Sequence, residues 1–121
     1  MLRWDPTDAL SCLGVAPEVG DYEERFAYAV AKDGLRLELT VFPDDGDVCL
    51  TIYRDGVAAP IVDVSIVQCD AARWVRDDRG SYLEFGAGRL FGGRYDGESP
   101  IPYGARLSVS PSISVEFFRS P

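Results

Sequence analysis

The chain contains no histidine at any of its 121 positions. A serine or cysteine nucleophile therefore lacks its usual general base, and proton transfer near neutral pH lacks its best-suited side chain. The same absence removes the commonest transition-metal ligand from the sequence. We therefore expect a non-catalytic protein without a metal site or a cofactor.

Cysteine is scarce as well. Cys12, Cys49 and Cys69 are widely spaced and odd in number, and no Cys-x-x-Cys pair is present. A disulfide framework or a zinc site would need a different pattern. We expect three buried free thiols in a protein of the reducing cytoplasm.

Long apolar runs are absent too. No run approaches the roughly 20 residues needed to span a bilayer. The first eight residues have neither the apolar core nor the cleavage-like site of a secretory leader. The net charge of −8 opposes binding to nucleic-acid phosphates and to anionic membranes. We therefore expect neither nucleic acid nor a membrane as a partner.

Acidic side chains are concentrated in the first part of the chain. Residues 1–50 contain eleven acidic and four basic side chains, a balance of −7, whereas residues 51–121 contain nine and eight, a balance of −1. Solubility is the plain explanation of this charge. A basic protein partner is the functional alternative, because opposite surface charges attract each other.

A length of 121 residues suits one domain, and we expect residues 1–121 to form a single one. Its only predicted helix covers residues 6–13, which follow Asp5 as a good N-cap. The spacing of the apolar residues places Leu10 and Leu13 inward. A helix this short must dock on the rest of the fold to be stable.

Residues 22–118 are predicted to form an antiparallel β body. Apolar and polar residues alternate in short segments, which turn sequences such as Asp33-Gly34 and Asp55-Gly56 separate. Strand pairs at spacings near ten residues are typical of sandwiches and barrels. The fold class is therefore mainly β, an antiparallel β-sandwich or flattened barrel of about seven to nine strands with one short N-terminal α-helix. The strands expected before the last segment are residues 26–31, 35–41, 48–52, 60–69, 74–75 and 82–85.

Alternation is most regular over residues 105–117, where apolar residues or proline occupy the odd positions. A single long strand bent at Pro111 fits this register, and a tight hairpin at the proline is the alternative. Because proline cannot donate to the ladder, the bend must lie at a sheet edge or at a crossing between sheets. A long edge strand could pair with a second copy, so this segment is also a candidate homodimer edge.

Residues 86–104 have no helical or alternating pattern, and they hold six of the chain's twelve glycines and two of its eight prolines. Loops this long are usually functional or disordered. Disordered linkers are poor in aromatic residues, so we expect this loop to fold back on the body with Phe91 and Ile101 turned inward. The residues expected on its outward, binding surface are Arg89, Arg94, Tyr95, Asp96, Glu98 and Tyr103.

Two segments resemble ligand-binding motifs but lack the spacing that those motifs require. The run Asp44-Asp-Gly-Asp47 lacks the spacing of a calcium loop, and a turn explains it. The glycines between Gly86 and Gly93 lack the spacing of a phosphate loop, and no helix or Walker lysine follows them. We therefore predict neither site.

The sequence favours a small, non-catalytic cytoplasmic protein-binding module, and an immunity- or inhibitor-type protein is one version of it. Tyrosine, phenylalanine and arginine are enriched at protein interfaces, which supports the loop as the binding site. The first alternative is a small-ligand-binding β domain, with Arg89 or Arg94 contacting an anion in a cleft under the loop. Local pairing of these arginines with Asp96, Glu98 or the acidic N-terminal half is their simpler role. The second alternative is a hydrolase that uses Asp96 and Glu98 as paired carboxylates.

Overall fold

The computed structural model describes residues 2–120 of the chain. The helix α1, Pro6–Leu13, begins at Asp5, whose carboxylate accepts two backbone N–H groups of the first turn at 2.9 and 3.2 Å. Gly14 ends the helix in the left-handed region with a φ of 76°. The predicted helix is therefore confirmed at both ends.

The buried side of α1 consists of Ala9, Cys12 and Leu13. Leu10 is instead 46% exposed, so its predicted inward position is wrong. Successive helical residues turn by about 100°, and a buried side that contains positions 9, 12 and 13 leaves position 10 toward solvent. In the described part of the chain, no helix is long and apolar enough to cross a membrane.

Five strands form the first sheet in the order β1-β2-β3-β4-β5, and every neighbouring pair is antiparallel. The Asp33-Gly34 turn between β2 and β3 has φ angles of 54° and 78°, as its sequence predicts. A short 3-10 helix, Asp21–Glu23, lies between β1 and β2. The strands are β1 (Glu18–Val19), which lies outside the predicted β body, β2 (Phe26–Lys32), β3 (Leu35–Phe42), β4 (Asp47–Arg54) and β5 (Val62–Ile66).

Four strands form the second sheet in the order β6-β7-β8-β9, again with antiparallel neighbours. They are β6 (Ala72–Asp77), β7 (Gly80–Gly86), β8 (Tyr103–Ser108) and β9 (Ser114–Arg119). β6 and β9 are the two outer strands of this sheet.

The predicted single strand over residues 105–117 is wrong, because this segment is the hairpin of β8 and β9. Leu107 lies opposite Val115, so cross-strand partners differ by an even number of residues and the odd positions of both strands share one face of the sheet. The alternation therefore continues across the turn, which contains Pro111. For this reason the alternation alone does not reveal that the chain reverses there. Of the two strands of this hairpin, β9 is the edge strand and β8 lies inside the sheet.

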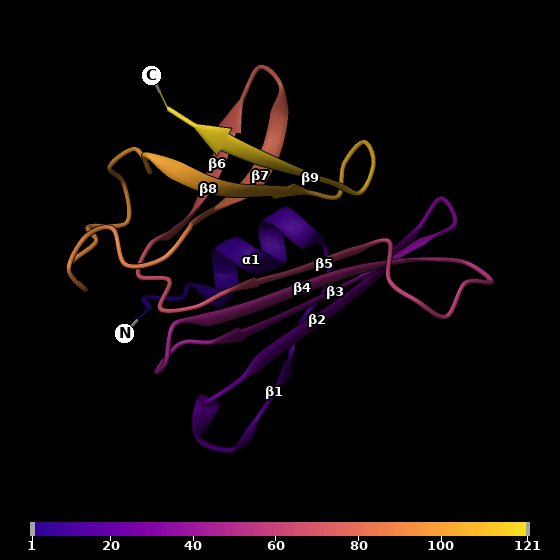
Figure 1. Cartoon of the computed structure of the whole chain (residues 1–121), viewed down its shortest axis with the longest axis horizontal. Helices are drawn as coiled ribbons and strands as arrows, with labels where there is room; N and C mark the ends of the chain where they lie inside the picture. The colour runs from indigo at the N-terminus through magenta and orange to yellow at the C-terminus, as the bar shows by residue number, and fades with distance from the viewer. Residues whose placement is uncertain (1, 121) are drawn as a thin grey trace.

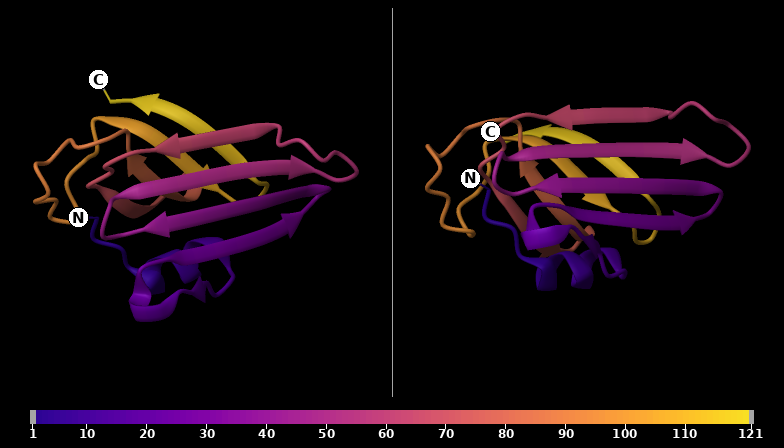
Figure 2. Two further views of the ribbon diagram at one scale, coloured as in Figure 1. Left: turned by 60° about the horizontal axis from the view of Figure 1, so that its bottom comes forward. Right: turned by 90° about the horizontal axis from the view of Figure 1, so that it is seen from below.

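The two sheets face each other as the layers of a β-sandwich, and α1 lies between them, packed against β6 and β7 (Figure 1; Figure 2). Between the layers, the Trp4 ring stacks on Phe85 with centroids 5.8 Å apart. Its Nε1 donates to the Tyr28 hydroxyl of the opposite sheet at 3.0 Å. The predicted mainly β fold is confirmed, and over residues 2–120 it is a sandwich of nine strands.

The three cysteines are free thiols, but they differ in exposure. Cys12 and Cys69 are buried, as expected. Cys49 is exposed, because it lies on β4 between the inward-facing Val48 and Leu50 and therefore points to the outer face of the sheet. The prediction of a buried thiol is wrong at this position.

Candidate functional site

The loop 86–104 lies at one end of the sandwich and connects two neighbouring strands (Figure 1; Figure 2). Gly86 of β7 pairs with Gly104 of β8 at the base of the loop. A Cβ at Gly104 would lie 1.8 Å from the Phe85 carbonyl oxygen, so this close approach requires glycine. The sheet therefore holds the loop at both of its ends.

A buried carboxylate outside the loop holds the first half of the loop. Asp70 lies between β5 and β6 and is 4% exposed. Its Oδ1 accepts the Leu90 N–H at 2.9 Å, and its Oδ2 accepts those of Phe91 at 3.0 Å and Gly93 at 2.8 Å. Burial raises the pKa of Asp70, but these donors and the charge of Arg89 outweigh it and lower the pKa below its ordinary value. Sequence reasoning missed Asp70, since no local pattern marks it.

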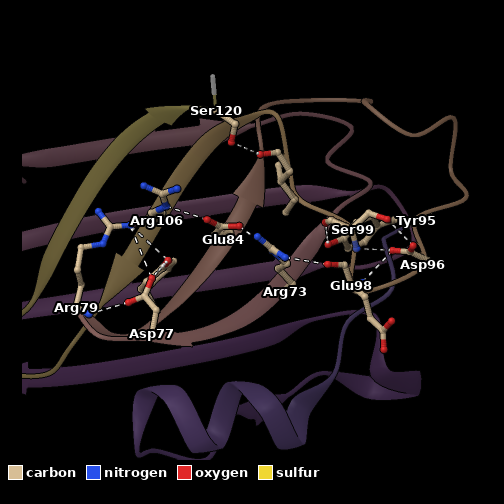
Figure 3. Close-up of polar contacts among 12 residues, drawn as sticks. Arg73, Asp77, Arg79, Glu84, Tyr95, Asp96, Glu98, Ser99, Arg106 and Ser120 are labelled. Atoms are coloured by element: carbon tan, nitrogen blue, oxygen red, sulfur yellow. Dashed lines mark hydrogen bonds and ion pairs between the residues drawn. The ribbon is translucent and has the colours of Figure 1, made fainter.

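Asp96 builds the second half of the loop. Its carboxylate accepts the backbone N–H groups of Glu98 at 2.9 Å and Ser99 at 2.8 Å, and the Ser99 hydroxyl also donates to it. The Ser99 hydroxyl and these N–H groups lower the pKa of Asp96 to about 2. Arg73 of β6 donates from Nη1 to the Glu98 carbonyl at 2.8 Å, which ties this turn to the second sheet (Figure 3).

Aromatic side chains fix the loop to the body. The Phe91 and Tyr95 ring centroids lie 4.6 Å apart, and the Tyr95 hydroxyl donates to the Ser99 carbonyl at 2.6 Å. The predicted inward position of Ile101 is confirmed. Tyr95, which was expected on the outward surface, is 8% exposed, because its ring completes a small apolar cluster. This cluster contains Ala71, Tyr95, Ile101 and Phe118, with Leu90 and Phe91 packed against it.

The other predicted site residues, Arg89, Arg94, Asp96, Glu98 and Tyr103, are exposed on the loop. Among the described residues, neither arginine forms an ion pair, so the expected pairing with Asp96 or Glu98 does not occur. The loop therefore presents two unpaired guanidinium groups, one tyrosine ring and two carboxylates to solvent. Arginine and tyrosine are enriched at protein interfaces.

A buried ion network crosses three strands of the second sheet (Figure 3). Glu84 of β7 is 1% exposed, and its carboxylate oxygens lie 2.8 Å from Nε of Arg73 on β6 and 2.8 Å from Nε of Arg106 on β8. The three residues are direct cross-strand neighbours. Because Arg73 also bonds to the Glu98 carbonyl, the network supports the loop. Sequence reasoning missed the network; pairing β6, β7 and β8 in register would have placed its members in one row.

The cleft expected under the loop is small and acidic. A cavity of about 190 Å3 lies between the start of α1 and the second half of the loop, whereas small-ligand pockets usually measure about 300–1,000 Å3. Neither Arg89 nor Arg94 lines this cavity. Arg89 lies in a separate hollow of about 160 Å3 beside Asp45 and Asp70, which disfavour an anion. The charged residues that line the larger cavity are Arg3, Asp5, Asp8, Arg73, Asp96 and Glu98.

The carboxylates of the loop do not form a poised acid–base pair. The Asp96 oxygens accept the donors of their own turn, and a pKa of about 2 is far too low for a general acid near neutral pH. Over residues 2–120, no group of three or more acidic or cysteine side chains is arranged to hold a metal ion. The geometry therefore does not support the predicted hydrolase role of Asp96 and Glu98.

Comparison with known proteins gives one informative similarity. No family model matches the sequence, and no curated protein matches it. Among solved structures, the fold is similar to that of a chain in a contact-dependent growth inhibition toxin–immunity protein complex from Klebsiella pneumoniae 342. The TM-score is 0.75 at 14% sequence identity, and the match covers 98% of this chain and 96% of that chain. The two chains share their fold from end to end.

Proposed function

We propose that this chain is a non-catalytic protein-binding module of the immunity type, which binds a growth-inhibition toxin and blocks its action. The observation that carries this proposal is the similarity to a chain from a toxin–immunity complex, which spans nearly the whole of both chains. A match of this extent concerns the complete arrangement of sheets and helix. The two sheets and α1 share one apolar core, which supports a single domain.

The charge of the chain supports the role of the immunity protein, and not that of the toxin, in a toxin–immunity pair. The net charge is −8, and the sequence contains no histidine for acid–base catalysis. The buried carboxylates of Asp70 and Glu84 bind backbone N–H groups and arginines of their own chain. An acidic protein attracts a basic partner and speeds its association. We therefore propose a basic toxin surface as the partner and the cytoplasm, where free thiols persist, as the location.

The proposed contact surface is the outward side of loop 86–104. Arg89, Arg94, Glu98 and Tyr103 are exposed there, while buried contacts hold the backbone that carries them. A loop that is already ordered loses little conformational entropy when it binds. The three backbone bonds of Asp70, the turn of Asp96 and the Tyr95 cluster supply that order.

We also propose that the chain forms a homodimer through the edge predicted within residues 105–117. The exposed edge available for it is β9, whose Phe117 is 69% exposed. Two copies could pair along this strand about a two-fold axis. The molar mass from light scattering tests this point, since a monomeric mass at high concentration contradicts it.

Capture followed by growth rescue tests the proposed function. The immobilised full-length chain captures proteins from its source organism, and each captured protein is then expressed alone in a bacterial host. We expect one captured protein to arrest growth and co-expression of the chain to restore it. A chain that captures no growth-inhibiting protein, or that fails to restore growth, contradicts the proposal.

A pair of matched variants tests the contact surface. Arg94→Ala with Tyr103→Ala removes two exposed loop side chains, and we expect capture of the toxin to fall about tenfold or more. Arg54→Ala with Val57→Ala removes exposed side chains near the turn that follows β4 and is expected to leave capture unchanged. Equal capture by the wild type and both variants would exclude the loop as the interface while leaving the toxin-binding function intact.

A further inference from the structure

Tyr22 is the most exposed aromatic side chain of the described chain. Its relative exposure is 102%, whereas the next large exposed apolar side chain, Phe117, is 69% exposed. Tyr22 lies in the turn between β1 and β2, within the 3-10 helix Asp21–Glu23. Its ring therefore contributes nothing to the packing of this chain.

The backbone at this turn is strained. Tyr22 has φ 58° and ψ 22°, and Glu23 has a φ of 56°, so two successive non-glycine residues adopt the left-handed region. The turn is closed by bonds from the Gly20 N–H to the Arg25 carbonyl at 2.8 Å and from the Glu23 N–H to the Gly20 carbonyl at 3.1 Å. Strain of this kind clusters at functional sites, where it places a side chain for a task outside folding.

The β1–β2 turn lies at the same end of the sandwich as loop 86–104 (Figure 1; Figure 2). All three views place these two segments and the β3–β4 turn at one end of the sandwich and the β2–β3 turn at the opposite end. The β1–β2 turn lies at the edge of the first sheet, and loop 86–104 lies beside the second sheet (Figure 1). The acidic charge of the β1–β2 turn suits the basic partner proposed above. Asp21, Glu23 and Glu24 lie in this turn, and Glu18 precedes it on β1, where it pairs with Arg25 at 3.8 Å. Asp44 and Asp45 lie in the β3–β4 turn.

Resting on the proposed function, we propose that Tyr22 is an aromatic anchor of the toxin interface and inserts into an apolar pocket ringed by lysine or arginine on the toxin. Tyrosine buries a large area at low entropic cost, which makes it a frequent hot spot of protein interfaces. The surrounding carboxylates match a basic rim around such a pocket. The β1–β2 turn and loop 86–104 then contact one partner together.

The test uses the growth-inhibiting protein isolated with the immobilised wild-type chain as its probe. Tyr22→Asn removes the ring and relieves strain, because asparagine tolerates the left-handed region. We expect bound probe to fall about tenfold or more while the Tm is unchanged or higher. Tyr22→Phe keeps the ring and is expected to bind within about threefold of the wild type. Val57→Asn, an exposed apolar side chain far from Tyr22 in the turn after β4, is expected to bind as the wild type does.

The possible outcomes distinguish a failure of the Tyr22 anchor from a failure of the proposed toxin-binding function. If the wild type binds the probe and Tyr22→Asn binds it equally, the anchor is excluded and the proposed function stands. If Tyr22→Phe loses binding as fully as Tyr22→Asn, the ring is not the binding element and the anchor is again excluded. If the wild type captures no growth-inhibiting protein, the proposed function and the anchor fall together.

Discussion

The carboxylate of Asp70 accepts the backbone N–H of Gly93, which lies 23 residues further along the chain, at 2.8 Å. The same carboxylate binds the N–H groups of Leu90 and Phe91. A residue of the β5–β6 connection thereby fixes the backbone of the loop proposed to bind the toxin. The loop is preformed, so its exposed arginines start from a defined backbone.

Removal of the Asp70 carboxylate should destabilise the chain. Asp70→Ala leaves three backbone N–H groups without their acceptor, and we expect the free energy of unfolding to fall by about 2–4 kcal/mol. Asp70→Asn keeps one acceptor oxygen and should lose less. Urea denaturation measures both values, and an Asp70→Ala variant as stable as the wild type would show that the loop is held by other contacts.

The stability should decline in acid because of the same residue. The pKa of Asp70 is lower in the folded chain than its ordinary value of 3.8, so its stabilisation is complete above pH 3.8 and is lost as the pH falls through the folded pKa. Asp96, with a folded pKa of about 2, acts in the same direction. We expect the free energy of unfolding to fall as the pH drops from about 4 to about 2, less steeply in Asp70→Asn. If the free energy of unfolding fell equally steeply with pH in the wild type and in Asp70→Asn, the Asp70 carboxylate would not be a source of the acid sensitivity.

Glu84 and Glu116 both pair with Arg106, but their removal should lower the free energy of unfolding by very different amounts. Glu84→Gln leaves Arg73 and Arg106 largely buried without their carboxylate, and we expect a loss of about 3–5 kcal/mol. Glu116 lies 3.1 Å from Nη1 of Arg106, but its side chain is 59% exposed. Glu116→Gln should therefore cost less than about 1 kcal/mol. Thermal and urea unfolding compare the variants, and similar losses for both would mean that the buried network is not a major support.

The three thiols should react unequally in the folded protein. Cys49 is exposed, Cys12 is buried, and burial raises the pKa of Cys69 to about 11. A thiol-specific reagent near pH 8 should therefore label Cys49 rapidly in the folded protein, and it should label all three cysteines after unfolding. Cys49→Ser is the control that should abolish the rapid phase. Rapid labelling of that variant would place a second thiol within reach of solvent.

Local patterns predicted much of the fold. Asp33-Gly34 gave the β2–β3 hairpin, because this dipeptide suits the two positive φ angles found there. The β8–β9 hairpin was predicted only as the alternative to a single strand, because Leu107 and Val115 share the same parity and the alternation runs through the turn. Periodicity reports the face of a residue, and it carries no information on whether the chain reverses.

The candidate site was predictable as a segment but not in its internal contacts. Glycine, proline and aromatic content marked loop 86–104 in the sequence. The burial of Tyr95 depends on a cluster with Phe118, which lies on β9, more than twenty residues further along the chain. The role of Asp70 depends on donors about twenty residues away. Such contacts are set by the tertiary fold, and a local pattern does not contain them.

Hydrogen–deuterium exchange of the chain alone and in complex with the captured toxin shows whether loop 86–104 and Tyr22 lie in the toxin interface. We expect slower exchange on binding in two segments, residues 20–25 and residues 86–104, with little change in the turns at 33–34 and 55–61. Protection confined to those two turns, or to the outer face of the second sheet, would contradict it, because the toxin would then bind away from the loop and Tyr22.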